Sequence, residues 1–123
     1  QALRFLLHSS VPTLKHLDLN ISNCNDITSR NFKYFNNLRT LTTLKINFSH
    51  CRKINKFFKL INFRNMDLLN ELCIDMSESG IDSKDFGSLD PNEVKHLSKI
   101  FIRAKSHQFD KMTSLKVLEL KSQ

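Results

Sequence analysis

The sequence of 123 residues predicts an α/β solenoid, with a parallel β-sheet on the concave side and helices on the convex side. The main observation is an apolar pattern, L-x-x-L-x-L-x-I-x-x-C-x-x-I, which runs from Leu14 to Ile27 and recurs in full from Leu41 to Ile54. Weaker copies begin at Leu69, Leu97 and Leu115, so that the first four copies start 27 or 28 residues apart. A fixed period of this length indicates stacked units that cannot bury their apolar faces alone.

The composition agrees with one globular domain over residues 1–123, because 40% of the residues are hydrophobic and 25% are charged. No run of about 18 apolar residues is present that would span a membrane. The chain begins without methionine and stops inside its fifth copy of the pattern. We therefore expect an internal fragment with about four and a half repeats, truncated at both ends.

These repeats resemble those of the leucine-rich repeat family, in its long, ribonuclease-inhibitor-like and cysteine-containing subtypes. The resemblance rests on the repeat length, on the C-x-x-I ending and on the segment CNDIT from Cys24 to Thr28, and it covers nearly the whole chain. The segment between Leu19 and Cys24 is longer than usual, which is similar to repeats common in ciliate protozoa. The resemblance implies a horseshoe or arc, in which the cysteine side chain turns inward and bonds backbone groups of adjacent turns.

Alternating apolar residues predict one strand in each unit, because successive strand side chains point to opposite faces. The second and third strands are expected at Thr43–Phe48 and Glu71–Met76. Placing the units in register predicts two inward-facing rows of side chains. One row is Leu17, Leu44, Leu72, Ile100 and Leu118, and the other is Leu19, Ile46, Ile74, Ile102 and Leu120.

The segments between the strands are predicted to form the convex layer. In residues 28–38 apolar side chains recur every three positions, and Thr28 or Ser29 can cap the helix. A second helix is expected around residues 55–62. The third unit is expected to have a looser connection, which Gly80 and Gly87 interrupt. A further helix is then expected to start with Asp90 as its cap.

The odd number of cysteines, outside any metal-binding spacing, indicates free thiols in a reducing compartment, and hence an intracellular protein, cytoplasmic or organellar. Cys24 and Cys51 occupy the inward slot of the repeat, and Ser79 and His107 stand in the corresponding slot of later units. Cys73 lies between two inward residues and is expected on the concave surface. No pairs have the spacing of a zinc site, so we expect no metal and no cofactor.

The sequence contains no catalytic signature. A nucleophile elbow, a phosphate-binding loop, a dinucleotide fingerprint and H-E-x-x-H are all missing. The concave-face carboxylates of Asp18, Glu71 and Asp75 are expected to have Lys45 and Lys99 as neighbours. This arrangement favours an ion-paired recognition surface, because acid–base catalysis needs carboxylates kept apart in a dry pocket. We expect neither enzyme activity nor a small-molecule substrate.

The resulting hypothesis is a non-catalytic interaction module or scaffold subunit that binds a protein partner through the concave sheet face. The expected partner-binding residues point outward from the strands: Asp18, Asn20, Lys45, Glu71, Asp75, Lys99, Phe101, Arg103 and Lys105. Two alternatives stay open. One is a basic, RNA-associated subunit of a ribonucleoprotein, suggested by the net charge of +7 and by Arg52, Lys53, Lys56, Lys59 and Arg64. The other is a purely architectural spacer in a large assembly.

Phe101 has two interpretations. If Ile100 and Ile102 fill the core, Phe101 points outward and has the character of an interface anchor, since aromatic residues dominate binding hot spots. Alternatively, the strand slips by one residue and Phe101 is buried. The outward position is favoured, because a slip would expose two isoleucines and bury Arg103 or Lys99.

Overall fold

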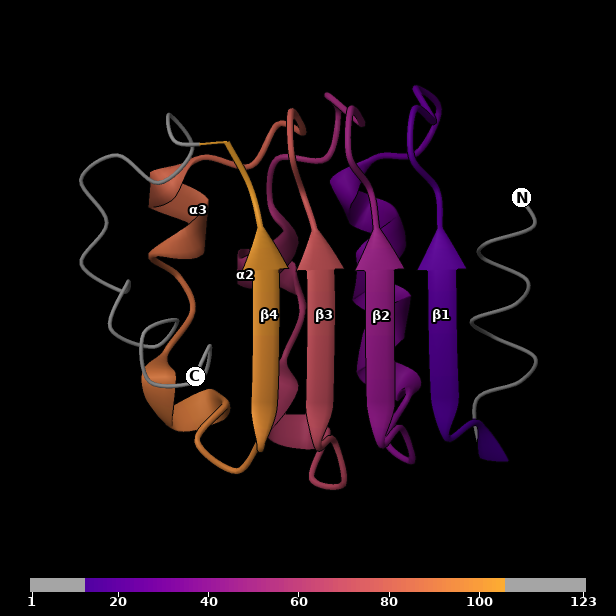
Figure 1. Ribbon diagram of the computed structural model, residues 1–123, viewed down its shortest axis with the longest axis vertical. Helices are drawn as coiled ribbons and strands as arrows, with labels where there is room; N and C mark the ends of the chain where they lie inside the picture. Colours follow the sequence, from indigo (N-terminus) through magenta and orange to yellow (C-terminus); the bar gives the residue numbers. More distant parts are fainter. Residues whose placement is uncertain (1–12, 106–123) are drawn as a thin grey trace.

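The computed structural model describes residues 13–105 and contains four parallel strands in the order β1-β2-β3-β4. Figure 1 shows them side by side in chain order. Their bounds are His16–Asn20 for β1, Thr43–Asn47 for β2, Glu71–Asp75 for β3 and Lys99–Arg103 for β4. The predicted parallel sheet is thus confirmed, and the second and third strands each end one residue earlier than expected.

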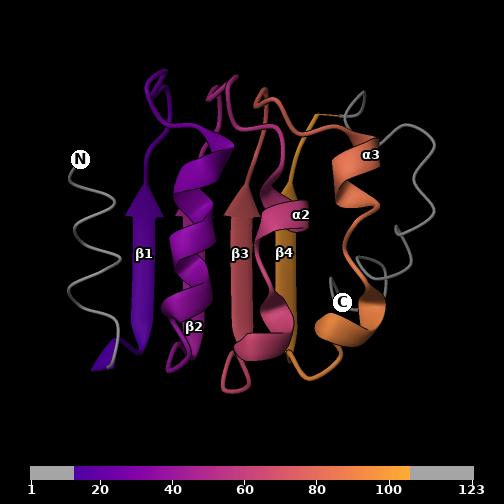
Figure 2. The same cartoon turned by 180° about the vertical axis from the view of Figure 1, so that it is seen from behind.

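Every connection between strands returns on the same face of the sheet (Figures 1 and 2). This layer contains short helices, which are η2 (Ser29–Asn37), α2 (Phe57–Leu60), η3 (Phe63–Asn65), α3 (Ser83–Phe86) and η4 (Pro91–Glu93). Within residues 13–105 no helix lies over the other face of the sheet. We call this other face the open face.

The first segment of the helical layer, η2, is a 3-10 helix, whereas helices of nine residues are usually α-helical. A 3-10 helix has three residues per turn, so that every third side chain lies on the same side. Phe32, Phe35 and Leu38 follow this spacing and are completely buried. The expected cap at Thr28 is confirmed, and its backbone N–H donates to Oδ1 of Asn31 at 3.0 Å.

The register of the sheet confirms both inward rows in the described residues. Leu17, Leu44, Leu72 and Ile100 pair across the four strands, as do Leu19, Ile46, Ile74 and Ile102. All are buried except Leu19 and Ile102, the two at the ends of the second row, which are partly exposed. The remaining members of the prediction, Leu118 and Leu120, lie outside the described residues, as does His107.

A continuous series of phenylalanine rings joins the segments that follow β1, β2 and β3 in the helical layer. Neighbouring ring centroids are 5.0 to 6.4 Å apart, and most pairs meet edge-on or tilted. Such arrangements stabilise aromatic pairs beyond the area that they bury. The series consists of Phe32, Phe35, Phe48, Phe57, Phe58, Phe63 and Phe86.

Two buried polar side chains hold the start of α2 from neighbouring units. Ser29 Oγ accepts hydrogen bonds from the N–H groups of Asn55 at 2.8 Å and Lys56 at 3.0 Å. From the other side, Asp85 Oδ2 accepts a bond from the N–H of Phe58 at 3.0 Å. Burial raises the pKa of the Asp85 carboxyl above its ordinary value. The bond to Phe58 satisfies an amide in the first turn of α2 that has no partner within the helix, and the bonds to Asn55 and Lys56 fix the segment that leads into it.

The inward cysteine position is confirmed in the second unit. Cys51 is completely buried, and its Sγ donates to the carbonyl oxygen of Ile21 at 2.9 Å. The prediction that Cys24 is equally buried is wrong, because it is partly exposed. Cys24 belongs to the first unit that the structure describes, and no described residues pack against the outer side of this unit. In the third unit, Ser79 Oγ accepts a bond from Ile81 N–H at 3.2 Å within its own unit.

Gly80 is required by close backbone approach between two units. A Cβ atom at this position would lie 2.5 Å from the carbonyl oxygen of Arg52 and 2.8 Å from that of Ile54. Real Cβ atoms essentially never approach backbone oxygens so closely. The loose connection expected between Gly80 and Gly87 instead contains α3, which places Phe86 in the core.

Candidate interaction surface on the open face

The register places the outward side chains of the four strands in three rows across the open face. The amino-terminal row is His16, Thr43, Glu71 and Lys99. The middle row is Asp18, Lys45, Cys73 and Phe101. The carboxyl-terminal row is Asn20, Asn47, Asp75 and Arg103. Eight of the nine predicted partner-binding residues therefore lie on one face, and the ninth, Lys105, lies two residues after the end of β4.

The amino-terminal row contains an ion pair between neighbouring strands. Lys99 Nζ lies 3.2 Å from Glu71 Oε1, which confirms the expected proximity of these residues. The lysine side chain is 59% exposed and that of the glutamate 27%, so water screens the pair and its contribution to stability is small. At this row, the charges of β3 and β4 cancel.

The carboxyl-terminal row is fixed by a turn that recurs after three strands. The side-chain Oδ1 atoms of Asn20, Asn47 and Asp75 each accept a hydrogen bond, at 3.0 to 3.1 Å, from the backbone N–H two residues later. These donors belong to Ser22, Ser49 and Ser77. The next residue in each turn has positive φ, at Asn23, His50 and Glu78. Such side-chain turns orient the polar groups of this row.

A shallow hollow of about 190 Å³ lies between the middle and carboxyl-terminal rows. Its polar and aromatic lining residues are Asp18, Lys45, Asn47, Cys73, Asp75, Phe101 and Arg103. The two carboxylates and two cations give the hollow no net formal charge. Five predicted site residues meet here, whereas Asn20, Glu71, Lys99 and Lys105 do not line it.

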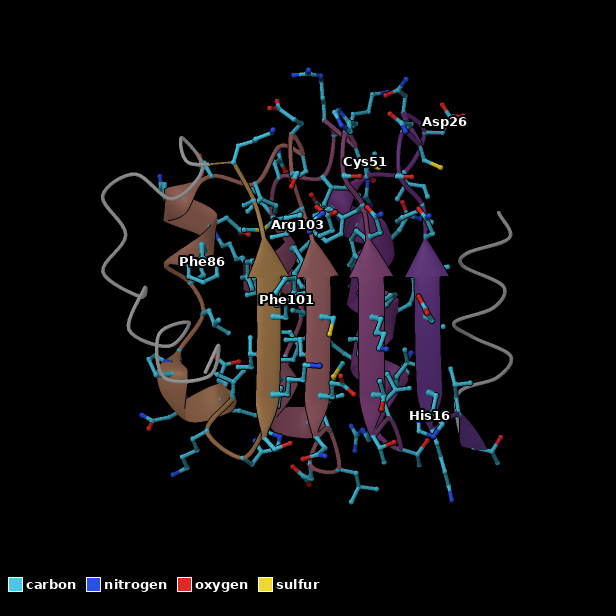
Figure 3. The ribbon with its side chains drawn as sticks, viewed as in Figure 1. His16, Asp26, Cys51, Phe86, Phe101 and Arg103 are labelled. Carbon is cyan, nitrogen blue, oxygen red and sulfur yellow. The ribbon has the colours of Figure 1, made fainter. Side chains whose placement is uncertain are left out.

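Phe101 points outward and its side chain is exposed, as the favoured interpretation predicted. It has 50% of its surface exposed, whereas the preceding Ile100 has 1%. The observed register therefore excludes the one-residue slip. Phe101 and Arg103 project from β4 on the open face (Figure 3). Within residues 13–105, the Arg103 guanidinium forms no ion pair.

The thiol of Cys73 is partly buried in the middle of the open face, as its alternation with buried neighbours predicted. Burial raises its pKa, and the negative charge of Glu71 adds to this effect, while Lys99 and Lys45 oppose it. The thiolate is the reactive form of cysteine, so a raised pKa keeps this side chain neutral and slows its reactions near neutral pH. Cys73 thus contributes a small, weakly polar surface beside Phe101.

Asn47 and Cys73 were not among the predicted partner-binding residues, yet both line the hollow. A signal for Asn47 was present, because the pattern Asn-x-Ser or Asp-x-Ser occurs at residues 20–22, 47–49 and 75–77. This pattern marks the recurring turn at the end of each strand. For Cys73, the signal was its register position next to an outward aromatic residue.

On the helical side, cations of the second unit remain exposed. Arg52, Lys53, Lys56 and Lys59 are exposed as expected, and Arg64 forms an ion pair of 2.9 Å with Asp90. A second hollow on this side is lined by Lys56 and Lys59 together with Asn55, Asp82, Lys84, Asp85 and Ser88. The basic cluster is therefore partly neutralised by acidic neighbours.

The described part of the chain offers no cluster of three or more histidine, cysteine, aspartate or glutamate side chains suited to a metal ion. Among residues 13–105, no helix has the length and apolar character needed to cross a membrane. Comparisons with protein-family models, with curated proteins and with solved structures gave no significant match. The structure by itself defines an α/β protein with a four-stranded, all-parallel sheet and short helices between the strands.

Proposed function

We propose that this protein is a leucine-rich repeat module that binds a protein partner through the open face of its sheet and does not catalyse a reaction. The observation that carries the proposal is the half-exposed ring of Phe101 on the same strand face as the guanidinium of Arg103, which forms no ion pair with any residue in the range 13–105. Interface cores are rich in aromatic and arginine residues, and these two types dominate measured binding energies. The hollow beside them offers both signs of charge, which suits the mixed surface of a folded protein or peptide.

The repeat assignment is supported by the agreement between the sequence period and the sheet register. Strand partners are 27 residues apart between β1 and β2 and 28 residues apart between later strands. The turn after β1, β2 and β3 also recurs with this spacing. In such an architecture each unit contributes one strand to a continuous face, and neighbouring units together form the binding surface.

A binding role agrees better with the hollow than a catalytic role. The hollow is shallow and open, so water screens its carboxylates. These side chains would therefore stabilise a charge that develops during a reaction only weakly. Glu71, whose Oε1 lies 4.0 Å from the Sγ of Cys73, is engaged by Lys99. The thiol itself is held in its neutral form.

Site-specific photo-cross-linking tests the proposal. A photoreactive phenylalanine analogue would replace Phe101 in one variant and Leu68 in a matched control. Leu68 is 59% exposed but does not line the hollow. After irradiation in cells, we expect discrete protein adducts from position 101 and none of the same adducts from position 68. No adduct from position 101, or identical adducts from both positions, would contradict the proposal.

RNA binding is the second candidate function, and the exposed lysines around the hollow on the helical side favour it. Replacing Lys56 and Lys59 by glutamate would weaken binding to a labelled single-stranded RNA if this surface carried it. Affinity for RNA would also fall steeply with added salt, because phosphate contacts release counterions. Binding that is insensitive to both changes would exclude this candidate.

A further inference from the structure

We infer that the β4 end of the open face recognises an acidic side chain and an apolar side chain two positions apart in an extended segment of the protein partner. This inference rests on the proposed function and specifies the partner's chemistry. It follows from the contacts available to Arg103, from the surroundings of Phe101 and from the spacing between them. The charge of the hollow then indicates whether a peptide or a nucleic acid is the better occupant.

Arg103 supplies the site for the acidic side chain. Its guanidinium has no ion pair within residues 13–105, although Asp75 is its register partner on β3. One oxygen of Asp75 already accepts the N–H of Ser77 at 3.1 Å. An arginine presents five N–H donors in a planar fork, which matches the two oxygens of a carboxylate. A carboxylate from a partner would therefore find unused donors at the edge of the hollow.

Phe101 and Cys73 supply the apolar site. They are register partners on adjacent strands, so their Cα atoms lie about 5 Å apart. The ring is half exposed, and the raised pKa of the thiol leaves it uncharged near neutral pH. An aliphatic or aromatic side chain from the partner can bury the exposed part of the ring without desolvating a charge.

The spacing along β4 sets the spacing in the partner. Phe101 and Arg103 are two residues apart and point from the same face of one strand. At about 3.3 Å per residue, their side chains start roughly 7 Å apart. Side chains at positions i and i+2 of an extended segment have the same separation and also share one face. An acidic and an apolar residue separated by one residue therefore fit both sites together.

The electrostatics of the hollow disfavour a phosphate backbone as its occupant. Asp18 and Asp75 balance the charges of Lys45 and Arg103 across the hollow. Nucleic-acid binding depends on concentrated positive charge that neutralises several phosphates. A single carboxylate needs only the one cation of Arg103, and the neighbouring Asp75 is already engaged by the N–H of Ser77. The charge distribution thus favours an acidic peptide over RNA on this face.

The experiment selects random linear peptides displayed on phage against the full chain and then measures the affinity of the enriched peptides by fluorescence anisotropy. We expect Asp or Glu two positions from Leu, Ile, Phe or Met. Arg103→Gln should weaken binding of such a peptide at least tenfold. Replacing the acidic residue of the peptide by the corresponding amide should weaken binding to wild-type protein but change the affinity for the Arg103→Gln variant little. Phe101→Ala should also weaken binding at least tenfold.

Lys53→Gln is the matched control, because Lys53 is an exposed cation that does not line the hollow, and it should leave the affinity unchanged. Urea unfolding would verify that all variants keep the wild-type stability. Enriched peptides without an acid, binding unaffected by Arg103→Gln, or no enrichment at all would each overturn this inference. Protein adducts at position 101 in the cross-linking experiment would still uphold the proposed function in those cases.

Discussion

Replacing Ile46 by alanine tests the inside–outside alternation on which the fold and the open face both depend. Ile46 is in the middle of the sheet on β2, is 2% exposed and pairs in register with Leu19 and Ile74. Its truncation removes buried carbon atoms and leaves a cavity between two units. Comparable core truncations cost about 2–5 kcal/mol, and we expect a loss in this range because the flanking strands limit collapse of the cavity.

Urea unfolding followed by far-UV circular dichroism measures this loss of free energy of unfolding. The matched control is Lys45→Ala, which changes the preceding residue on the open face and should shift the free energy by less than about 0.5 kcal/mol. The slope of the free energy with urea should remain similar in all three proteins. A cost below about half a kcal/mol for Ile46→Ala, or equal costs for both variants, would refute the register.

Three further predictions concern the packing between units. Gly80→Ala should destabilise the protein by about 1–3 kcal/mol in the same unfolding assay, because its Cβ would lie 2.5 and 2.8 Å from two backbone oxygens, and wild-type stability would contradict this. Burial raises the pKa of Asp85, so the folded form favours the protonated acid. Wild-type protein should therefore lose stability as the pH rises above 3.8 through the raised pKa of Asp85, whereas Asp85→Asn should not. The free energy of unfolding of Asp85→Asn minus that of wild type should increase over this range, and a difference that does not change with pH would disprove this. Alkylation followed by mass spectrometry should modify Cys73 well before the buried Cys51, whereas equal rates would contradict the alternation.

The strands and their register were predictable because a fixed period and strict alternation leave few options. In a sheet with one buried face, a shift by one residue exchanges all core residues for polar ones. The apolar side chains of Ile100 and Ile102 therefore determine that Phe101 points to the open face. The same reasoning placed Glu71 opposite Lys99, which the ion pair confirms.

The segments of the helical layer were less predictable because packing rather than helix propensity shapes them. The three-residue recurrence of phenylalanines in residues 28–38 matched a 3-10 helix, which is rare at this length. Gly80 suggested a flexible break, yet it is required by the backbone of the preceding unit. Phe86 was not predicted as a core residue because its short helix has no apolar periodicity of its own.

The arrangement of the candidate site was only partly predictable for a related reason. Register assigns side chains to a face, but it does not show which of them enclose a hollow. The bonds that orient Asn47 and Asp75 depend on turns closed by the following residues. Cys24 was expected to be buried like Cys51, but burial at this slot requires a stacked turn, and none is described on its outer side.

The effect of Phe101→Ala on stability and on binding tests the central claim most directly. Because the ring is half exposed, the free energy of unfolding should change by less than about 0.5 kcal/mol. Binding to the protein identified by cross-linking at position 101 should weaken by about 2 kcal/mol or more, measured by titration calorimetry. A large loss of stability with unchanged affinity would contradict the proposal that Phe101 anchors a partner on the open face.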